Sequence, residues 1–361
     1  MERVLITGGA GFIGKHLALA LIKEGHTVTI YDNFHSQVHA DPAATALELQ
    51  SEGIEILRSD IRDSEALARA VSATCPHIIV HLAAETGTGQ SYDLPARYCD
   101  VNVTGTAHLV EAIRTARRGG GASVKRVVLA SSRAVYGEGA CLYEGHPALA
   151  EPRSADDMAA GDFEPKNAAG KTLTPIPTRS TTTAVAPASV YASTKLMQEY
   201  LLRQALWQSG VECAILRLQN VYGAGQVLHN PYTGVLSIFA RQLLDGATLR
   251  IFEDGKIVRD FVYVSDVVEA FLTVCRSQIA PPDPLDIGTG QDTTILEVAQ
   301  MMMEALGLPP ERFQITGEFR PGDIRYAVAD IADARAQLGW VPAISLREGV
   351  EKLLTWTKMV S

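Results

Sequence analysis

The feature that most constrains the fold is a glycine-rich turn close to the start of the chain. A nonpolar run, Val4–Thr7, leads directly into Gly8, Gly11 and Gly14, and a helical stretch follows. Glycine suits such a turn because the backbone bends sharply, approaches a phosphate closely and lets the helix pack against the strand. A helix that begins there offers unpaired backbone amides to negative charge. The motif therefore predicts a strand, turn and helix that bind a dinucleotide.

Short nonpolar runs alternate with longer helical stretches over residues 3–132. The expected strands are Val4–Thr7, Thr27–Tyr31, Ile54–Leu57, Ile78–Leu82 and Lys125–Ser131. The expected helices are Phe12–Glu24, Ala43–Ser51, Ser64–Ser72 and Ala96–Arg118. Such alternation is typical of an α/β protein with a doubly wound parallel sheet of the Rossmann type, covered by helices on both faces.

The periodicity disappears between about residues 138 and 188, where proline, glycine, alanine and threonine dominate. We expect this segment to be a long insertion without a core of its own. Periodicity returns in an expected helix, Ser189–Gln208, and an expected strand, Val211–Leu218. We therefore assign residues 1–190 to a dinucleotide-binding domain that residues 191–218 complete. Most of the remainder of 191–361 is expected to form a smaller, interleaved α/β region that binds the substrate.

Composition excludes several classes of partner. The net charge is −9 and no basic block occurs, so we expect neither nucleic acid nor a membrane surface as a partner. No stretch supplies the ~18 uninterrupted nonpolar residues of a membrane-spanning helix. The five cysteines are widely spaced and none is in a Cys-x-x-Cys pair, which is typical of a reducing compartment. We expect a cytoplasmic protein without disulfide bonds and without a bound metal.

Asp32 is the expected ligand of the adenosine ribose, because it follows the second expected strand, about 20 residues after the central glycine. A carboxylate there repels a 2′-phosphate, and residues 33–38 contain no Arg or Lys, so NAD is favoured over NADP. The alternative is that Asp32 and Asn33 only form a turn. The expected cofactor contacts are Gly8, Gly11, Phe12, Ile13, Gly14, Asp32, Asn33, Asp60, Ile61, Leu82, Ala83, Ala84, Asn102, Ser131, Tyr191 and Lys195.

Tyr191 and Lys195 lie one helical turn apart, on the same face of an expected helix. This spacing also arises by chance, and a core tyrosine beside a lysine that extends to the surface is the alternative. Ser131 and Ser132 end the fifth expected strand, and a parallel sheet of this type presents its ligands at the carboxyl ends of its strands. We therefore predict that Ser132, Tyr191 and Lys195 are catalytic.

Seven motifs occur in an order that makes the pattern specific. They are the glycine turn, Asp32, His81–Ala84, Ser131–Gly137, Tyr191–Lys195, Leu216–Gly223 and Arg259–Val264. Over essentially the whole chain this order resembles the sugar-nucleotide epimerases and dehydratases of the extended short-chain dehydrogenase/reductase family. The chain is most similar to dTDP-L-rhamnose 4-epimerases and, more distantly, to UDP-glucose 4-epimerases. The closer similarity lies in Asn230–Val235, Ile251–Gly255 and Pro321–Arg325.

The resemblance implies epimerisation at C4 of a nucleoside diphosphate sugar, with NAD as the cofactor. Tyr191 would take the proton of the 4-hydroxyl, Ser132 would bind the same oxygen, and C4 would give its hydride to NAD. The resulting 4-keto sugar would turn over and take the hydride back on its other face. A phenol with a pKa near 10 becomes such a base if its pKa falls by about three units, which needs roughly 4 kcal/mol of stabilisation from Lys195 and the nicotinamide charge.

The resemblance also implies a set of residues that bind the substrate. They are Thr86, Ser132, Arg133, Tyr191, Asn220, Arg259, Arg320 and Asp323. Asn220 and Arg259 would bind the diphosphate. Arg320 would supply a second positive charge, with Asp323 near the ribose. The alternative for each arginine is an ordinary solvated surface position.

The insertion departs from relatives of the rhamnose type, which often carry a cysteine pair that could bind a metal. Cys141 and His146 cannot complete a tetrahedral zinc site in this chain. We expect the insertion to form a lid or rim over the sugar pocket. The resemblance further implies a homodimer, formed through the helices Ala96–Arg118 and Ser189–Gln208.

Three other functions stay open. A 4,6-dehydratase usually carries an Asp-Glu pair after the catalytic hydroxyl residue, where this chain has Arg133 and Ala134. A 4-ketoreductase would release its cofactor and would more often bind NADP, which Asp32 opposes. A dinucleotide-sensing regulatory protein would have no use for the three catalytic residues together.

Overall fold

The chain forms two compact units in the computed structural model, which describes residues 1–119, 124–228, 234–320 and 322–360. Most of Asn230–Val235, and Pro321, lie outside the described residues. Unit 1 consists of Met1–Ser132, Ser193–Arg217 and Val268–Pro284. Unit 2 consists of Arg133–Ala192, Leu218–Val267 and Leu285–Ser361. The binding roles assigned to residues 1–190 and 191–361 stay predictions.

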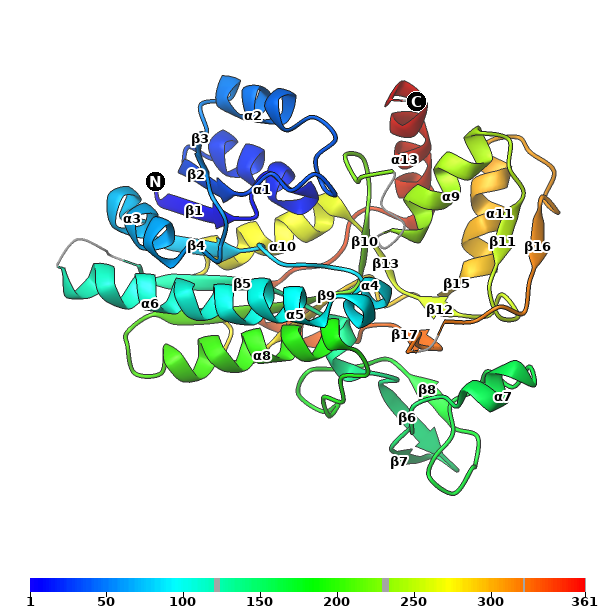
Figure 1. Ribbon diagram of the computed structural model, residues 1–361. Coiled ribbons are helices and arrows are strands. Elements are labelled where there is room, and N and C mark those ends of the chain that lie inside the picture. Colours follow the sequence, from blue (N-terminus) through cyan, green and yellow to red (C-terminus); the bar gives the residue numbers. More distant parts are fainter. Residues whose placement is uncertain (120–123, 229–233, 321, 361) are drawn as a thin grey trace. The chain divides into compact units, whose positions relative to one another are not determined.

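Unit 1 is built on a parallel β-sheet, of which it contains the strands β9-β5-β4-β1-β2-β3 in this order (Figure 1). These strands are β1 (Arg3–Thr7), β2 (Thr27–Asp32), β3 (Glu55–Arg58), β4 (Ile78–His81), β5 (Arg126–Ser132) and β9 (Glu212–Leu218). Strand β1 pairs in parallel with both β2 and β4, so the strand order changes direction beside β1. Sheets of this kind bind ligands beyond the carboxyl ends of the strands at such a reversal. The predicted Rossmann-type sheet is confirmed.

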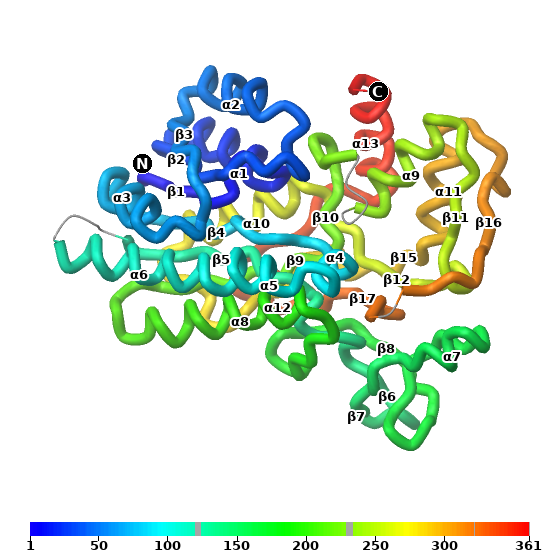
Figure 2. The backbone as a smooth tube through the Cα atoms, viewed as in Figure 1, coloured from blue at the N-terminus to red at the C-terminus, as the bar shows by residue number. Residues whose placement is uncertain are grey.

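The helices of unit 1 bury their nonpolar faces in a shared core. They are α1 (Phe12–Lys23), α2 (Pro42–Ser51), α3 (Ser64–Thr74), α4 (Thr88–Asp93), α5 (Pro95–Tyr98), α6 (Gly105–Arg118) and most of α8 (Val190–Ala205) and α10 (Val264–Arg276). Figure 2 traces how the first strands and helices follow one another along the chain. Leu67 of α3, Leu109 of α6 and Ile79 of β4 are fully buried in one cluster. Asp41 and Asp63 cap the N-termini of α2 and α3 with their side chains.

The expected helix Ala96–Arg118 is not continuous. Between α5 and α6, residues Cys99–Thr104 form a π-helical turn. Such turns are rare and often lie at functional sites. The hydrophobic pattern did not reveal the turn, because one wider turn shifts the nonpolar face of a helix only locally.

Unit 2 contains short strands and separate helices. Its strands outside the insertion are β10 (Asn220–Tyr222), β11 (Leu249–Ile251), β12 (Val258–Arg259), β13 (Phe261–Tyr263), β14 (Leu285–Ile287), β15 (Thr293–Thr294), β16 (Phe313–Ile315) and β17 (Tyr326–Ala327). Its helices outside the insertion are α9 (Val235–Leu244), α11 (Ile295–Ala305), α12 (Ala332–Leu338) and α13 (Leu346–Val360). Among the described residues these strands form the small sheets β10-β13, β11-β16 and β15-β12-β17. This is an interleaved α/β region, as the sequence predicts.

The insertion belongs to unit 2 and has regular structure. Strands β6 (Ala140–Tyr143), β7 (His146–Ala148) and β8 (Thr174–Ile176) form an antiparallel sheet, and α7 (Ala155–Ala159) lies between β7 and β8 in the sequence. Cys141, Met158, Phe163 and Leu173 are buried. The insertion therefore has regular strands and buried nonpolar side chains that the sequence does not reveal, while the expectation that it lacks a core of its own stays a prediction. Its strands have only three or four residues, too few for a visible periodicity.

Candidate active site

The glycine turn between β1 and α1 is packed too closely for side chains at Gly8 and Gly14. Gly8 has φ +69°, and a Cβ atom added to it would lie 2.6 Å from the backbone nitrogen of Ala83. A Cβ atom on Gly14 would lie 2.6 Å from the carbonyl oxygen of Gly8. Helix α1 has Gly11 as its N-cap, and no described side chain caps it. The first amides of α1, from Phe12 onward, are therefore available to an anion.

The carboxylate of Asp32 is fixed beside the glycine turn at the end of β2. Its Oδ2 accepts a hydrogen bond from the backbone nitrogen of Ala10 at 3.0 Å, and its Oδ1 accepts one from Phe34 at 2.7 Å. A carboxylate oxygen has room for a second donor, so ribose hydroxyls can still bind. His39 follows directly after residues 33–38, and its Nε2 lies 3.8 Å from Oδ1. Burial lowers the pKa of this histidine. The imidazole is therefore neutral at pH 7 and offers no charge to a 2′-phosphate.

Asn33, Asp60 and Ile61 lie together at the ends of β2 and β3. Asn33 Nδ2 donates to Asp60 Oδ2 at 3.0 Å. Arg62 Nε donates to Asp60 Oδ1 at 2.8 Å, and this bond holds the pKa of Asp60 well below its usual range. Ile61 is buried and approaches Gly105 so closely that a Cβ atom there would meet it at 2.7 Å. The arrangement fits the predicted adenine end of the cofactor site, whose role stays a prediction.

Asn102 lies in the π-helical turn and connects three segments of unit 1. Its Oδ1 accepts from the backbone nitrogen of Glu85 at 2.7 Å. Its Nδ2 donates to Thr194 Oγ1, on α8, at 2.9 Å. Leu82 and Ala84, also predicted to contact the cofactor, are half-buried in the segment that runs from β4 towards Glu85. The π turn thus ties this segment to α8.

Helix α8 carries both Tyr191 and Lys195, one turn apart. The ammonium of Lys195 is buried and donates to the carbonyl oxygen of Ala130, on β5, at 2.8 Å. It also donates to Gln198 Oε1 at 2.9 Å. Burial lowers the pKa of Lys195 to about 7, against the opposing effect of the nearby Glu199 carboxylate.

Gln198 is a residue that the sequence analysis missed. It is fully buried, and its Nε2 donates to Thr106 Oγ1 at 2.8 Å. His81 Nε2 lies 2.9 Å from the same hydroxyl, and burial lowers the pKa of His81 to about 3. Neutral groups therefore surround the lysine on this side. The i, i+3 spacing from Lys195 to Gln198 is the signal that could have revealed this contact.

Ser131 and Ser132 end β5, directly after Ala130. Ser131 Oγ donates to Glu199 Oε1 at 2.5 Å, and Arg217 binds the same carboxylate with two hydrogen bonds, at 3.0 and 2.7 Å. These bonds fix the end of β5 against α8 through buried side chains. Ser132 is half-buried at the last position of the strand.

Several predicted substrate residues lie together in unit 2. Arg259 Nη2 donates to Asp323 Oδ1 at 2.6 Å. Arg133 is buried, and its Nε has no hydrogen-bond partner within the described part of the chain. Burial, and then the neighbouring charge of Arg259, lower the pKa of Arg133 to about 10. Two guanidinium groups that repel each other, one with a free N–H, fit an anionic ligand.

The remaining residues predicted to bind the substrate lie in different parts of the chain. Asn220 begins β10 and pairs with Phe261 of β13. Arg320 is exposed, and its guanidinium lies 4.8 Å from the ring centre of Phe252. Thr86 belongs to unit 1 and is exposed. The roles predicted for Thr86, Asn220 and Arg320 stay predictions.

Within the described ranges, no three or more His, Cys, Asp or Glu side chains form a group that could hold a metal ion. All five cysteines are described and are free thiols. Among the described residues no helix combines the length and the nonpolar character that a membrane crossing requires.

Comparisons with known proteins agree with the motifs. The model of the NAD dependent epimerase/dehydratase family matches residues 4–288. The chain is 39% identical to dTDP-L-rhamnose 4-epimerase of Burkholderia thailandensis, over 98% of this chain and 94% of that protein. It is 33% identical to UDP-glucose 4-epimerase of Mycolicibacterium smegmatis, over 97% and 96% of the two chains. The crystal structure of Thermus thermophilus UDP-glucose 4-epimerase in complex with NAD is similar with a TM-score of 0.77 and 30% identity, covering 99% of this chain and 100% of that chain. The resemblance inferred from the motifs is confirmed.

Gly14→Ala tests the glycine turn. The added Cβ would meet backbone atoms of Gly8 and Gly9 at 2.6 Å, so the turn must move away from the position that accepts a pyrophosphate. We expect NAD to bind at least about ten-fold more weakly, a loss of roughly 1.4 kcal/mol. Isothermal titration of the cofactor-free protein with NAD measures this. Gly119→Ala is the matched control, because its Cβ would meet no atom closer than 3.6 Å.

Burial of Lys195 predicts a pH dependence of stability. Between about pH 7 and 10.5 the unfolded chain binds more protons at Lys195 than the folded chain does. The free energy of unfolding therefore rises with pH in this window, by roughly 1 kcal/mol per pH unit from this residue. Lys195→Met should remove this rise of the free energy of unfolding. The variant should therefore be more stable than the wild type at low pH, and this difference should shrink as the pH rises.

Urea titrations of the cofactor-free protein at about pH 6 and about pH 9 measure this advantage. Lys23→Met, at an exposed position, controls for the loss of one positive charge. An advantage of Lys195→Met that is equal at both pH values would contradict the effect of burial.

Proposed function

The chain belongs to the NAD dependent epimerase/dehydratase family, and from that premise we propose that it inverts C4 of a nucleoside diphosphate sugar. The enzyme depends on NAD, in keeping with the family and with the glycine turn, whose two close approaches a Cβ atom would block. Two relatives with similarity over nearly the whole chain are 4-epimerases, one of dTDP-L-rhamnose and one of UDP-glucose.

The observation that carries the proposal is the position of the Lys195 ammonium. Its hydrogen bond to Ala130 O at 2.8 Å holds it against β5, two residues before Ser132. The same helix carries Tyr191 one turn earlier. A cation held at this point stabilises a phenolate, because an opposite charge in a poorly solvated environment favours the ionised form. A regulator that only senses a dinucleotide has no need for this arrangement.

We assign the steps as follows. Tyr191 takes the proton of the sugar 4-hydroxyl, while Ser132 donates a hydrogen bond to the same oxygen. The glycine turn would hold NAD, which would supply the hydride transfer from the sugar and back to it. Lys195 balances the negative charge of the Tyr191 phenolate before it takes the proton and again after it returns it. After the keto sugar turns over, Tyr191 returns the proton, and the net reaction is an inversion without oxidation.

The diphosphate is assigned to the positive charges of unit 2. Arg259 and Arg133 supply the charge, and the free Nε of Arg133 supports a ligand that accepts a hydrogen bond. Asn220 adds an amide donor and Asp323 accepts from the ribose. An acidic protein needs such local donors to bind a dianionic substrate. Both thymidine and uridine diphosphates fit this chemistry.

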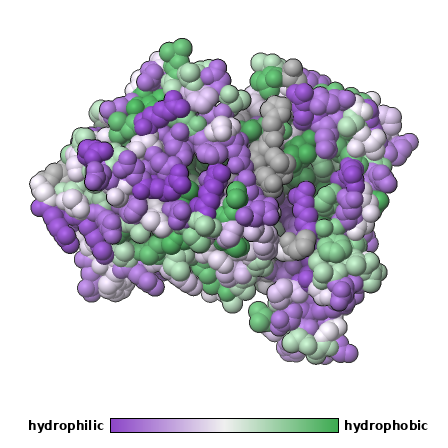
Figure 3. Space-filling view, in the orientation of Figure 1, coloured by the Kyte–Doolittle hydropathy of each residue, from purple (hydrophilic) through white to green (hydrophobic). Residues whose placement is uncertain are grey.

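We also propose a cytoplasmic homodimer. Met197, Tyr200 and Trp207 lie on or just after α8 and are 44%, 44% and 74% exposed. Figure 3 shows hydrophobic residues over the region where α6 and α8 lie in Figure 1. Exposed aromatic and nonpolar side chains along α8 support a contact between two copies. The free cysteines support a reducing compartment.

Incubation with dTDP-L-rhamnose and with UDP-glucose tests the reaction. We expect NMR to detect inversion at C4 of at least one of them, with no net consumption of NAD. Tyr191→Phe should lower kcat by at least about a hundred-fold, because proton transfer is lost. Tyr200→Phe, on an exposed part of the same helix, is the matched control. A 6-deoxy-4-keto product formed from UDP-glucose would identify a dehydratase instead, because that product requires the loss of the 6-hydroxyl.

Sedimentation velocity tests the dimer. We expect the wild type to sediment with twice the mass of one chain and Tyr200→Asp to shift the protein towards the monomer, because a charge would be buried in the contact. Ile279→Asp, at a position 77% exposed outside α6 and α8, should leave the mass unchanged. A monomeric wild type at micromolar concentration would rule the dimer out.

A further inference from the structure

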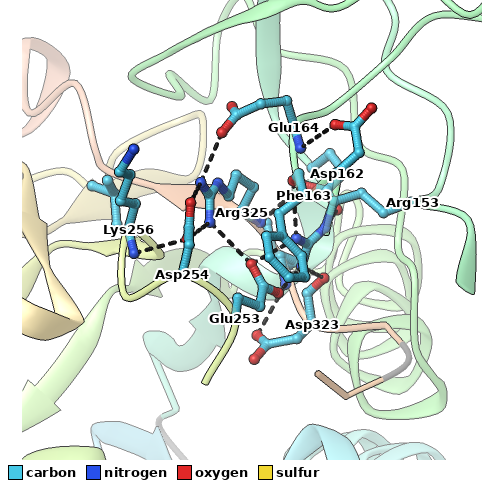
Figure 4. A network of polar contacts seen from close by, with 12 residues as sticks. Arg153, Asp162, Phe163, Glu164, Glu253, Asp254, Lys256, Asp323 and Arg325 are labelled. Carbon is cyan, nitrogen blue, oxygen red and sulfur yellow. Dashed lines mark hydrogen bonds and ion pairs between the residues drawn. The ribbon is translucent and has the colours of Figure 1, made fainter. Parts of the chain in front are cut away.

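Two buried arginines tie the insertion to the rest of unit 2 (Figure 4). The side chain of Arg153, from the insertion, is only 3% exposed. Its Nε donates to Glu138 Oε1 at 3.2 Å and its Nη1 to Glu253 Oε2 at 3.0 Å. Its Nη2 donates to the carbonyl oxygen of Asp323 at 2.7 Å. One guanidinium group therefore contacts the insertion, the Glu253 turn and the Asp323 segment together.

Arg325 makes the second tie. Its Nη1 donates to Glu253 Oε2 at 3.0 Å and to Asp254 Oδ1 at 2.7 Å. Its Nη2 donates to Glu164 Oε1, in the insertion, at 2.7 Å. Its backbone nitrogen donates to Glu138 Oε2 at 3.1 Å. One oxygen of the Glu138 carboxylate thus binds the Arg153 side chain, and the other binds the backbone nitrogen of Arg325.

Glu253 shows that this network is held firmly. It is 1% exposed and has φ +53°, a left-handed conformation that costs free energy for a residue with a side chain. Such a conformation persists where the surroundings determine it, and here the two arginines bind its carboxylate. The insertion is therefore fixed against this turn by desolvated, charge-assisted hydrogen bonds.

Asp323 connects the network to the proposed diphosphate site. Its Oδ1 accepts from Arg259 Nη2 at 2.6 Å, while its carbonyl oxygen accepts from Arg153. Arg259 also donates to the carbonyl oxygen of Ile324 at 2.7 Å. The residue that orients the Arg259 guanidinium is thus held by Arg153 at its backbone.

We propose that Arg153 is a positioning residue through which the insertion sets the orientation of Arg259, so that the insertion acts as a fixed brace of the diphosphate site. The proposal rests on the proposed function, in which Arg259 binds the diphosphate. Arg153 does not contact the substrate. Its fork of donors is what allows one side chain to reach Glu138, Glu253 and Asp323 together, and a lysine ammonium cannot do this.

Arg153→Lys tests the proposal, because it keeps the charge and removes the fork. UDP and dTDP are titrated into the NAD-loaded protein, and the one that the wild type binds more tightly is used for all variants. We expect about ten-fold weaker binding and a similar rise in KM, since one lost charge-assisted contact has about this effect. The kcat and the bound NAD should stay within about two-fold of the wild type, because the catalytic residues are untouched.

Lys166→Met is the matched control. Lys166 forms ion pairs with Asp157 at 3.0 Å and Asp162 at 2.7 Å, all within the insertion and without contact to Asp323. It should bind the nucleoside diphosphate as the wild type does. A ten-fold loss in Lys166→Met as well would overturn the proposal, since any disturbance of the insertion would then have the same effect.

A double-mutant cycle with Arg259→Met decides whether Arg153 acts through Arg259. We expect Arg153→Lys alone to weaken nucleoside diphosphate binding. The double variant should bind no more weakly than Arg259→Met alone. Equal effects in both backgrounds, or wild-type binding by Arg153→Lys, would overturn the proposal. A parallel loss of NAD, kcat and nucleoside diphosphate binding would also overturn it, since it would indicate general unfolding. If the wild type itself neither epimerises nor binds a nucleoside diphosphate, the proposed function fails instead.

Discussion

The buried ammonium of Lys195 is the interaction on which the candidate site depends. Removing a charge from water is costly, and the lowered pKa of Lys195 reflects this cost. The structure offsets part of it with two hydrogen bonds, which the ammonium donates to Ala130 O and Gln198 Oε1. Gln198 is itself held by Thr106, so the oxygen that accepts from the lysine has a fixed direction. A lysine kept in such surroundings gains most when an anion forms beside it, which is the state that the Tyr191 phenolate supplies.

The region around Lys195 shows which features of this protein can be predicted from its sequence. The strands, the glycine turn and the Tyr191–Lys195 spacing follow from local patterns, namely nonpolar periodicity, glycine positions and one helical turn. Asn102 was predicted as a cofactor contact, but its π-helical turn was not, because the turn is stabilised by bonds to Glu85 and Thr194 that are distant in sequence. Gln198 was missed although its spacing is local, because a glutamine carries no chemical signature of its own.

Unit 2 was harder to predict for a different reason. Its insertion depends on charged side chains that meet across long stretches of sequence, such as Arg153 with Glu253 and Asp323. Charged residues in a stretch rich in proline and glycine are typical of a solvated loop, and hydrophobic periodicity says nothing of ion pairs. Phe163 is buried, and the Arg325 guanidinium lies 5.9 Å from its ring centre. A nonpolar contact and a charged contact thus meet at one side chain of the insertion.

Charge balance explains why the arginines of unit 2 have to be fixed in place. The chain has a net charge of −9 but must attract a diphosphate, so its positive charges have to be placed rather than abundant. Arg133 and Arg259 repel each other, and the carboxylates of Glu138 and Asp323 offset that repulsion. A mobile carboxylate at Asp323 could turn towards solvent and leave the two arginines free to separate. Arg153 of the insertion holds the backbone of Asp323 and opposes this movement. The Arg259 guanidinium and the Asp323 carboxylate then keep a fixed geometry. An insertion that only covered the sugar would need no such bonds, whereas one that preorganises a phosphate site requires them.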